Sequence, residues 1–277
     1  MEQDHRELCL LHANCQGEPL ALLLRSSPEF SVRWRVRHYT NYTREAIPTE
    51  DIAGATLFLY QHLGADWDEF SSAALLGAVN PDAVSLCIPN MFFKGYWPFW
   101  TNDSPMDFAD VLLEKLLASG AGKPEIIKIY LHGTVTNMMN VDAVVAETLR
   151  IETDKEERCD IKTAAFIAQN WKERRLFQTV NHPGEELLLM TAQEILARLG
   201  LPPLSDEICA AFKYDYEGFH LPIHPKVASY FGLAFADESM EYLVFGKKMT
   251  FAQYVSRYID CRLNGFEDSF LGYLQLV

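Results

Sequence analysis

The segment that decides the fold lies close to the start of the chain and reads Leu8-Cys9-Leu10-Leu11-His12-Ala13-Asn14-Cys15-Gln16-Gly17. Its first four residues are a short continuous apolar run, which is typical of a strand buried on both faces of a parallel sheet. A helix is predicted to follow quickly, because Asn14 is a good N-cap residue and the leucine-rich segment 20–24 supplies one apolar face. The segment therefore predicts a strand, a tight turn and a helix, which is the start of a βαβ unit.

Three further strands are predicted downstream, over residues 31–37, 55–61 and 83–89. The first of them alternates strictly and places its arginines on one side, which is typical of a half-exposed edge strand. Residues 68–79, between the second and the third, have a helical pattern. Strands that alternate with helices indicate an α/β fold built on a doubly wound, mostly parallel sheet.

The second half of the chain has a different pattern. Residues 123–175 and 187–199 are predicted to be mostly helical, and residues 249–263 to form a closing amphipathic helix. We expect two parts, an α/β sheet core with the functional site over 1–122 and a mainly helical part over 123–277 that packs on it, with one single domain overall as the alternative. The closing helix is expected in the core or in an oligomer contact, so a homodimer is one expectation.

The composition excludes several classes of protein. The 277 residues include 24 Lys and Arg against 38 Asp and Glu, which gives a formal net charge of −14. Affinity for nucleic acid comes largely from Lys and Arg that neutralise phosphates, so no nucleic-acid partner is expected. With 49% hydrophobic and 22% charged residues the chain is too apolar for disorder, and a packed core is expected.

The sequence lacks targeting and metal-binding patterns. The apolar run after the polar start is cut at His12, and no stretch of about 18 apolar residues occurs, so neither a signal peptide nor a membrane span is predicted. The expected compartment is therefore the cytoplasm. The six cysteines form no Cys-x-x-Cys pair and are interpreted as reduced thiols. No His-Glu-x-x-His occurs, so no metal site is predicted.

Polar side chains follow three of the predicted strands at the point where each strand ends. Asn14, Cys15 and Gln16 follow the first strand, Gln61 ends the third, and Asn90 follows the fourth. Ligands of doubly wound sheets bind outside the carboxyl ends of the strands, so these residues are expected to share one rim and to form a site. The alternative is that each has a local role only, as a helix cap, a loop residue or a turn residue.

Cys15 is the most distinctive single residue of this rim. A helix N-terminus favours a thiolate and can lower the pKa of a thiol from about 8.5 to between roughly 3.5 and 7.5. Gly17 lets a ligand approach the backbone closely, and Asn14 and Gln16 are able to donate hydrogen bonds to developing negative charge. The other five cysteines have no such neighbours and are interpreted as inert small hydrophobic residues.

These residues resemble a known family, the WcbI-type polysaccharide-biosynthesis acetyltransferases, whose fold is related to that of the SGNH hydrolases. The resemblance rests on a set of short motifs spread over most of the chain: Asn14-Cys15-Gln16-Gly17, Leu59-Tyr60-Gln61, Ile88-Pro89-Asn90, Asn181-His182-Pro183 and Pro222-Ile223-His224-Pro225. It implies binding of coenzyme A or acetyl-coenzyme A and transfer of an acyl group to a sugar hydroxyl. It also implies that Cys15 stands where the SGNH hydrolases carry their serine.

His182 is the candidate general base. It precedes Pro183 and a predicted helix, so its backbone is restricted, which suits a group that takes a proton from an acceptor hydroxyl. The alternative is a buried histidine hydrogen-bonded to the backbone. The SGNH hydrolases carry their histidine in an Asp-x-x-His motif, which is absent here because Thr179 holds the Asp position. The partner of this histidine is therefore not identified by the sequence.

Several residues are candidates for contact with the cofactor. The aromatic-rich segment 91–100 is interpreted as a lid or a surface for pantetheine and adenine, with Lys94 at a phosphate, or as a hydrophobic cover over the sheet. Arginine offers forked donors to phosphate, so the run 172–175 is a second phosphate candidate, with a solvated helix face as its alternative. The edge that carries Arg33, Arg35 and Arg37 is another candidate for the phosphates. The complete set of predicted cofactor-binding residues is Cys15, Gly17, His12, Lys94, Lys172, Arg174 and Arg175.

The leading hypothesis is an acyl-coenzyme A dependent O-acyltransferase that acts on a sugar or glycan in polysaccharide or capsule biosynthesis. Its catalytic residues are predicted to be Cys15, His182, Asn14, Gln16, Gln61 and Asn90. In one version Cys15 attacks the thioester, and in another it only positions the thioester for direct transfer. Two alternatives are a cysteine esterase or thioesterase that uses water as acceptor, and a non-catalytic protein that binds coenzyme A or a glycan.

Overall fold

A computed structural model describes residues 5–216 and 218–276 of the chain. The contacts within the chain divide it into two compact units, which are described separately. Unit 1 comprises Met1–Phe92, Ile151–Gln169 and His182–Tyr214, and unit 2 comprises Phe93–Arg150, Asn170–Asn181 and Asp215–Val277. The predicted division into domains 1–122 and 123–277 concerns which parts of the chain fold independently. The compactness of a unit does not test independent folding, so this division stays a prediction.

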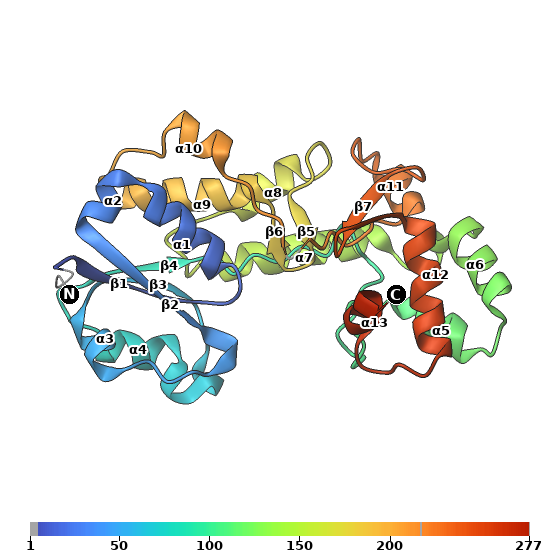
Figure 1. The fold of residues 1–277 in the computed structure, drawn as a ribbon, viewed down its shortest axis with the longest axis horizontal. Helices are drawn as coiled ribbons and strands as arrows, with labels where there is room; N and C mark the ends of the chain where they lie inside the picture. Colours follow the sequence, from blue (N-terminus) through green and yellow to red (C-terminus); the bar gives the residue numbers. More distant parts are fainter. Residues whose placement is uncertain (1–4, 217, 277) are drawn as a thin grey trace. The chain divides into compact units, whose positions relative to one another are not determined.

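Unit 1 is built on a four-stranded parallel sheet, which confirms the predicted α/β class. The strands are β1 (Glu7–Ala13), β2 (Trp34–Thr40), β3 (Ala55–Gln61) and β4 (Val84–Ile88). Their order across the sheet is β2-β1-β3-β4, with all neighbours parallel (Figure 1). The chain therefore places β2 on one side of β1 and places β3 and β4 on the other, so the strand order reverses between β1 and β3. Doubly wound sheets bind their ligands at such a switch point, outside the carboxyl ends of the strands.

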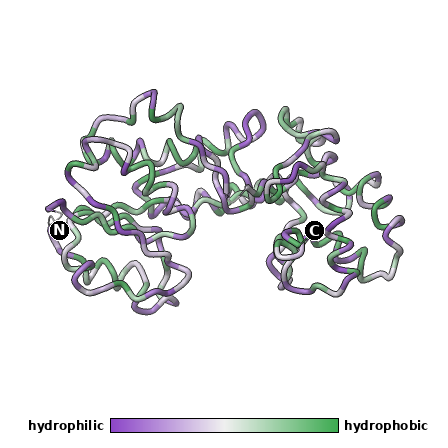
Figure 2. Tube along the Cα trace, in the orientation of Figure 1, coloured by the Kyte–Doolittle hydropathy of each residue, from purple (hydrophilic) through white to green (hydrophobic). Residues whose placement is uncertain are grey.

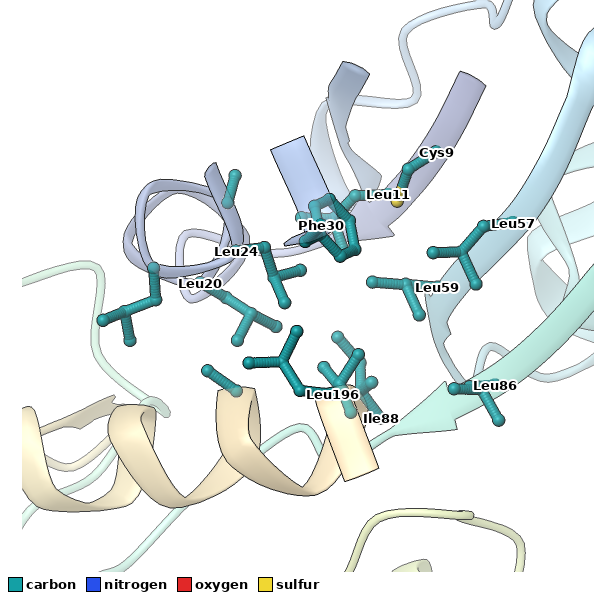
Figure 3. Packing of buried hydrophobic residues seen from close by; sticks show 14 of the residues in the cluster. Cys9, Leu11, Leu20, Leu24, Phe30, Leu57, Leu59, Leu86, Ile88 and Leu196 are labelled. Atoms are coloured by element: carbon teal, nitrogen blue, oxygen red, sulfur yellow. The ribbon is translucent and has the colours of Figure 1, made fainter. Parts of the chain in front are cut away.

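Helices cover both faces of this sheet. Helices α1 (Gly17–Ser26), α2 (Pro28–Arg33) and α9 (Glu185–Arg198) lie on one face, and α3 (Thr49–Gly54) and α4 (Ser72–Ala78) lie on the other (Figure 1). Because β1 is buried on both faces, its side chains alternate between the two hydrophobic clusters. Leu11 packs with α1 and α9 in the cluster of Figure 3. Leu10 packs with Phe58 and Leu75 in the other cluster. This arrangement explains the continuous apolar run with which β1 begins.

The remaining elements complete unit 1 and lead to unit 2. They are η1 (Asn41–Thr43), η2 (Ala65–Phe70), α7 (Val141–Glu156), α8 (Ala164–Asn170), β5 (Phe177–Thr179), β6 (His182–Pro183) and α10 (Asp206–Ala211). Helix α7 contributes residues to both units, and β5 belongs to unit 2. The helical character predicted for this part of the chain is confirmed.

Unit 2 is mainly helical and has an aromatic core. Its helices are α5 (Val111–Ala118), α6 (Lys123–His132), η3 (Val135–Asn137), α11 (Pro225–Phe231), α12 (Phe251–Leu263) and α13 (Phe270–Leu276), and an antiparallel hairpin joins β7 (Glu241–Val244) to β8 (Lys247–Thr250). The aromatic segment 91–100 supplies much of the core: the ring of Phe93 contacts Tyr96, Trp171 and Phe177. These rings are buried inside unit 2, so they do not form an exposed lid.

Four predicted boundaries are wrong by a few residues, and local capping explains three of them. The strand predicted over 31–37 begins at Trp34, because Ser27 caps α2 by accepting the Phe30 N–H and Pro28 occupies the first turn of that helix. Ser104 followed by Pro105 in the sequence also predicts the start of a helix, but the helix begins at Val111, because the Asp110 side chain caps it. The helix predicted over 68–79 is divided at Ser71, which caps α4.

The fourth correction concerns Asn14, which does not occupy the N-cap position of α1. The N-cap residue is Gln16, and its side chain makes no capping hydrogen bond. The side chain of Asn14 instead accepts a hydrogen bond from the Gln16 N–H, over 2.9 Å. This bond closes the turn between β1 and α1, which carries Cys15.

No helix among the described residues is long and apolar enough to cross a membrane. Figure 2 shows hydrophobic and hydrophilic residues interspersed along both units, as expected for segments that each bury one face only.

Candidate functional site

Cys15 and His182 form a pair at the carboxyl edge of the sheet in unit 1. Cys15 lies in the turn that follows β1, and His182 lies in β6, shortly before α9. The Cys15 Sγ atom is 3.2 Å from the His182 Nε2 atom, although 167 positions separate the two residues in the sequence. A nucleophile and a base within hydrogen-bond reach are the minimum requirement for nucleophilic catalysis by a thiol.

Burial controls the charge of this pair. His182 is 3% exposed, and burial lowers the pKa of its imidazole from 6.5 to about 4. Burial also raises the pKa of the half-buried Cys15 thiol above its ordinary value, although the backbone N–H groups of Cys15 and Gln16 oppose the shift. The predicted lowering of the Cys15 pKa is therefore wrong, because lost hydration outweighs the two N–H groups. Both shifts favour a neutral thiol beside a neutral imidazole.

A network of buried amides connects the three strand ends that meet at this edge. The Gln61 Oε1 atom accepts the Asn14 N–H over 2.8 Å, and the Gln61 Nε2 atom donates to the Pro89 carbonyl over 3.2 Å. Gln61 also donates to the Gln16 side chain over 3.3 Å, and Gln16 in turn bonds both the N–H and the carbonyl of Met91. The side chains of Gln61 and Gln16 thus fasten together the loops that follow β1, β3 and β4.

Asn14 and Asn90 lie at the same rim but are less buried. The Asn14 Nδ2 atom donates to the Asn90 Oδ1 atom over 3.1 Å. The Asn90 carbonyl accepts from the Nζ atom of Lys155, over 2.6 Å. The structure therefore brings together all six residues that the sequence predicted as catalytic, in three polar arrangements: the Cys15–His182 pair, the Gln16–Gln61 network and the Asn14–Asn90 pair.

The other residues predicted near Cys15 have identifiable packing roles. An added Cβ atom at Gly17 would lie 2.3 Å from the Nε2 atom of His38, so this glycine makes room for an imidazole. That imidazole contacts the Ala13 carbonyl over 3.1 Å. His12 is buried, and its pKa is lowered to about 4 by burial and, to a smaller extent, by His38. A role of Gly17 and His12 in cofactor binding stays a prediction.

The basic residues predicted at the phosphates belong to unit 2. Arg175 is partly buried and donates to the carbonyls of Phe177 and Leu221, over 3.3 and 3.2 Å. Lys94 lies over the Trp100 ring at 5.7 Å, and burial lowers its pKa. Lys172 lies over two rings of the same unit, and the Arg174 carbonyl accepts a hydrogen bond. These contacts give Arg175 a structural role within unit 2, and phosphate binding by the set stays a prediction.

Sequence reasoning missed a further residue of the amide network, Asn41. It is buried, and its Nδ2 atom lies 3.4 Å from the Gln61 Oε1 atom. Asn41 follows β2 directly, as Asn14 follows β1, so a correct end for this strand would have placed it at the rim. The three-residue displacement of the predicted edge strand concealed it.

Within residues 5–216 and 218–276, no group of three or more His, Cys, Asp and Glu side chains is arranged to hold a metal ion. The six cysteines are all free thiols.

The fold and this site define an α/β protein with a parallel, doubly wound sheet and a cysteine–histidine pair at the β1–β3 switch point. The sequence profile described as "Polysaccharide biosynthesis enzyme WcbI" matches residues 8–204, which is more than half of the chain. The chain therefore belongs to the WcbI family. No curated protein matches it.

A solved structure shares the fold over almost the entire chain. It is described as WcbI, a polysaccharide biosynthesis enzyme, in the form without a disulfide bond between coenzyme A and a cysteine. The TM-score is 0.78 at 20% sequence identity, over 98% of this chain and 93% of the other. At this identity the likeness establishes the fold alone. The cytoplasmic location and the homodimer stay predictions.

Proposed function

We propose that this protein is an acyl-coenzyme A dependent O-acyltransferase that takes acetyl-coenzyme A, or a related thioester, and acylates a sugar hydroxyl. The observation that carries the proposal is the 3.2 Å contact between Cys15 Sγ and His182 Nε2. The polysaccharide-biosynthesis family supports a sugar acceptor, and the description of the similar structure supports coenzyme A as the ligand near a cysteine. The kinship with SGNH hydrolases, with Cys15 in the serine position, is part of the same proposal.

The first half of the proposed reaction forms an acyl-enzyme. The Cys15 thiol gives its proton to His182 Nε2 as the sulfur attacks the thioester carbonyl, and a new S–C bond forms. The bond from that carbon to the coenzyme A sulfur then breaks. His182 returns the proton to the departing thiolate, so the imidazole is neutral again and coenzyme A leaves as a thiol. A neutral imidazole suits this sequence, because burial lowers the pKa of His182 to about 4 and the ring therefore carries no proton on the nitrogen that accepts one in the first step.

The second half transfers the acyl group to the acceptor. His182 takes the proton of a sugar hydroxyl as its oxygen attacks the acyl carbon, and the C–S bond to Cys15 breaks. The proton on His182 returns to the Cys15 sulfur, and the free thiol is restored. A direct version, in which Cys15 only positions the thioester and His182 activates the sugar hydroxyl, uses the same residues without the covalent intermediate.

Charge that develops on the carbonyl oxygen needs hydrogen-bond donors at this rim. The N–H groups of Cys15 and Gln16 face the Cys15 sulfur and counteract the rise of its pKa. The carboxamides of Asn14 and Asn90 are the less buried donors beside it. We assign Asn14 and Asn90 to the oxyanion, and Gln16 and Gln61 to the positioning of the turn that carries Cys15.

Intact mass measurement tests the proposal. Wild-type protein mixed with acetyl-coenzyme A, without an acceptor, is expected to gain one acetyl group, which peptide mapping places on Cys15. Cys15→Ala should gain none, and His182→Gln should gain it far more slowly, because the thiol then lacks its proton acceptor. Cys209→Ala is the matched control, since Cys209 is the other partly exposed cysteine.

The other outcomes separate the alternatives. Turnover of acetyl-coenzyme A with a sugar but without an adduct would support direct transfer. Steady release of acetate without a sugar would identify a thioesterase. Ligand at 100 times its dissociation constant should stabilise the fold by about 2.7 kcal/mol, so the absence of a thermal shift at millimolar coenzyme A would count against coenzyme A binding altogether.

A further inference from the structure

Two buried cysteines outside the candidate site lie within contact distance of each other. Cys87 is in β4 and is 1% exposed, and Cys159 follows α7 and is 9% exposed. Their Sγ atoms are 3.6 Å apart, although the residues are 72 positions apart in the sequence. Both belong to unit 1. We propose that Cys87 and Cys159 are an oxidation site, at which a disulfide of a small thiol, such as oxidised glutathione, is reduced while a Cys87–Cys159 disulfide forms.

The backbone around the pair already holds the two chain segments together. The Asp160 N–H donates to the Cys87 carbonyl over 2.9 Å, and the Cys87 N–H donates to the Asp160 Oδ2 atom over 2.7 Å. The Ile161 N–H donates to the same carbonyl over 3.3 Å. A disulfide needs sulfur atoms about 2.0 Å apart. Because the backbones are fixed at hydrogen-bond distance, rotation of the two side chains supplies most of the remaining approach.

The chemistry balances without any further reactant. One thiol of the pair loses its proton, and its thiolate attacks a sulfur of the small disulfide, which releases one small thiolate. The second thiolate of the pair displaces the other small thiol from the mixed disulfide. Two S–H bonds are lost from the protein, one S–S bond is formed, and two small thiols are released. The contact with Cys159 lowers the pKa of Cys87, which favours Cys87 as the attacking thiolate.

The position of the pair connects it to the candidate site. The residues that follow β4 bond the amide network, since Pro89 and Met91 are partners of Gln61 and Gln16. Near the end of α7, Lys155 bonds the Asn90 carbonyl and Glu152 bonds the Phe92 N–H. A disulfide between Cys87 and Cys159 would join the two elements that hold the segment 89–92. We therefore expect oxidation to change the reactivity of Cys15, and reduction to restore it.

Peptide mapping of the full chain after incubation with oxidised glutathione tests the proposal. The denatured and alkylated protein should yield the Cys87–Cys159 cross-linked peptide, and dithiothreitol should remove it. In a Cys15→Ala background, formation of the cross-link should lower the number of thiols from five to three. In the same background, Cys87→Ser or Cys159→Ser should prevent the cross-link. Cys261→Ser is the matched control, because Cys261 is buried in unit 2 and should leave the cross-link intact.

Recovery of Cys87 and Cys159 as alkylated thiols, or only as mixed disulfides with glutathione, after prolonged oxidation would overturn the proposal. The alkylation rate of Cys15 gives the second readout. It should differ between the oxidised and reduced wild type but not between oxidised and reduced Cys159→Ser. Equal Cys15 alkylation rates in the oxidised and the reduced wild type, with the cross-link present in the oxidised form, would contradict the proposed effect of the disulfide on Cys15. None of these results depends on acyl transfer, so they separate this proposal from the proposed function.

Discussion

At the scale of single residues, the Cys15–His182 pair is held neutral by its surroundings. Burial raises the pKa of Cys15 and lowers that of His182 to about 4, and both shifts disfavour a thiolate–imidazolium pair. This arrangement differs from a thiolate that is activated permanently by a helix N-terminus. In the proposed reaction, the Cys15 thiol therefore loses its proton to His182 only as the sulfur attacks the thioester carbonyl.

We predict that the alkylation of Cys15 by iodoacetamide accelerates continuously between about pH 6 and pH 9, since only the thiolate reacts and its pKa is raised. Peptide mapping gives the rate at Cys15 alone. His182→Gln should shift the pH profile only slightly, because a neutral imidazole places no positive charge beside the Cys15 sulfur. A plateau in the wild type near pH 7 would show that an ion pair already exists.

Gly17 supports a second prediction about a single residue. A Cβ atom there would meet the His38 imidazole at 2.3 Å, so Gly17→Ala should lower the free energy of unfolding by about 1–3 kcal/mol. In a His38→Ala background the same substitution should cost much less, because the obstructing ring is gone. Urea denaturation of the four proteins of this cycle measures the coupling. An equal cost in both backgrounds would assign the need for glycine to another contact.

At the scale of elements, the candidate site is the meeting point of loops that single side chains hold together. Gln61 ends β3 and accepts the Asn14 N–H of the loop after β1. Gln61→Leu leaves that partly buried donor without its partner, so the free energy of unfolding should fall by about 1–3 kcal/mol and the alkylation rate of Cys15 should change. Gln193→Leu on α9 is the control. An unchanged alkylation rate in destabilised Gln61→Leu would restrict the amide network to a structural role.

Helix α7 contributes a pH-dependent contact to the same loops. Glu152 accepts the Phe92 N–H, and burial raises its pKa to about 7, although Lys155 opposes the shift. The fold therefore favours the protonated carboxyl, and its stabilising effect is lost as the pH rises from about 4.5 through 7. At about 1.4 kcal/mol for each pKa unit, the loss is on the order of 3 kcal/mol. Glu152→Gln should remove this part of the pH dependence.

Urea denaturation at a series of pH values measures the difference between wild type and Glu152→Gln. The difference should grow in favour of the variant as the pH rises from 5 to 8. Glu147→Gln, an exposed change on the same helix, should show no such growth. A difference between wild type and Glu152→Gln that does not vary with pH would contradict the raised pKa.

The same scale shows why some elements could be predicted and others could not. Strands β1, β3 and β4 were predicted to within two residues, because burial on both faces requires continuous apolar runs. The beginning of β2 was missed, since the alternation of 31–37 extends into α2 and only the Ser27 cap decides where the helix ends. Because the predicted strand ended three residues too early, Asn41 was not recognised as a residue at the end of a strand.

At the scale of the whole molecule, the sequence predicted which strand ends carry polar residues, but not which of those residues contact one another. The Gln16–Gln61 network depends on distances between loops that no periodicity encodes. The charge state of Cys15 depends on burial by segments far along the chain, among them the one that carries His182. Each of the two compact units combines separate stretches of chain, and a pattern that is read along the sequence does not encode such a combination.

The net charge of −14 leads to the last prediction, which concerns the binding of a polyanionic ligand by an acidic protein. Added salt screens charges beyond a Debye length of about 10 Å at 0.1 M. If the overall field dominated, salt would strengthen coenzyme A binding by weakening repulsion. We expect the opposite, because a bound phosphate needs positive side chains in direct contact, and their attraction is what salt weakens. Titration calorimetry at about 50 and 200 mM NaCl should therefore show lower affinity at the higher concentration.

Charge variants identify the positive residues that produce this salt dependence. Lys172→Ala combined with Arg174→Ala should weaken binding and flatten the dependence on salt. Arg33→Ala at the end of α2, combined with Arg35→Ala in β2, should leave both unchanged. Arg175 is unsuitable as a probe, because its guanidinium donates to backbone carbonyls and its loss would disturb the fold. Affinity that rises with salt in the wild type would mean that no basic cluster meets the phosphates, and the predicted role of Lys172 and Arg174 would be wrong.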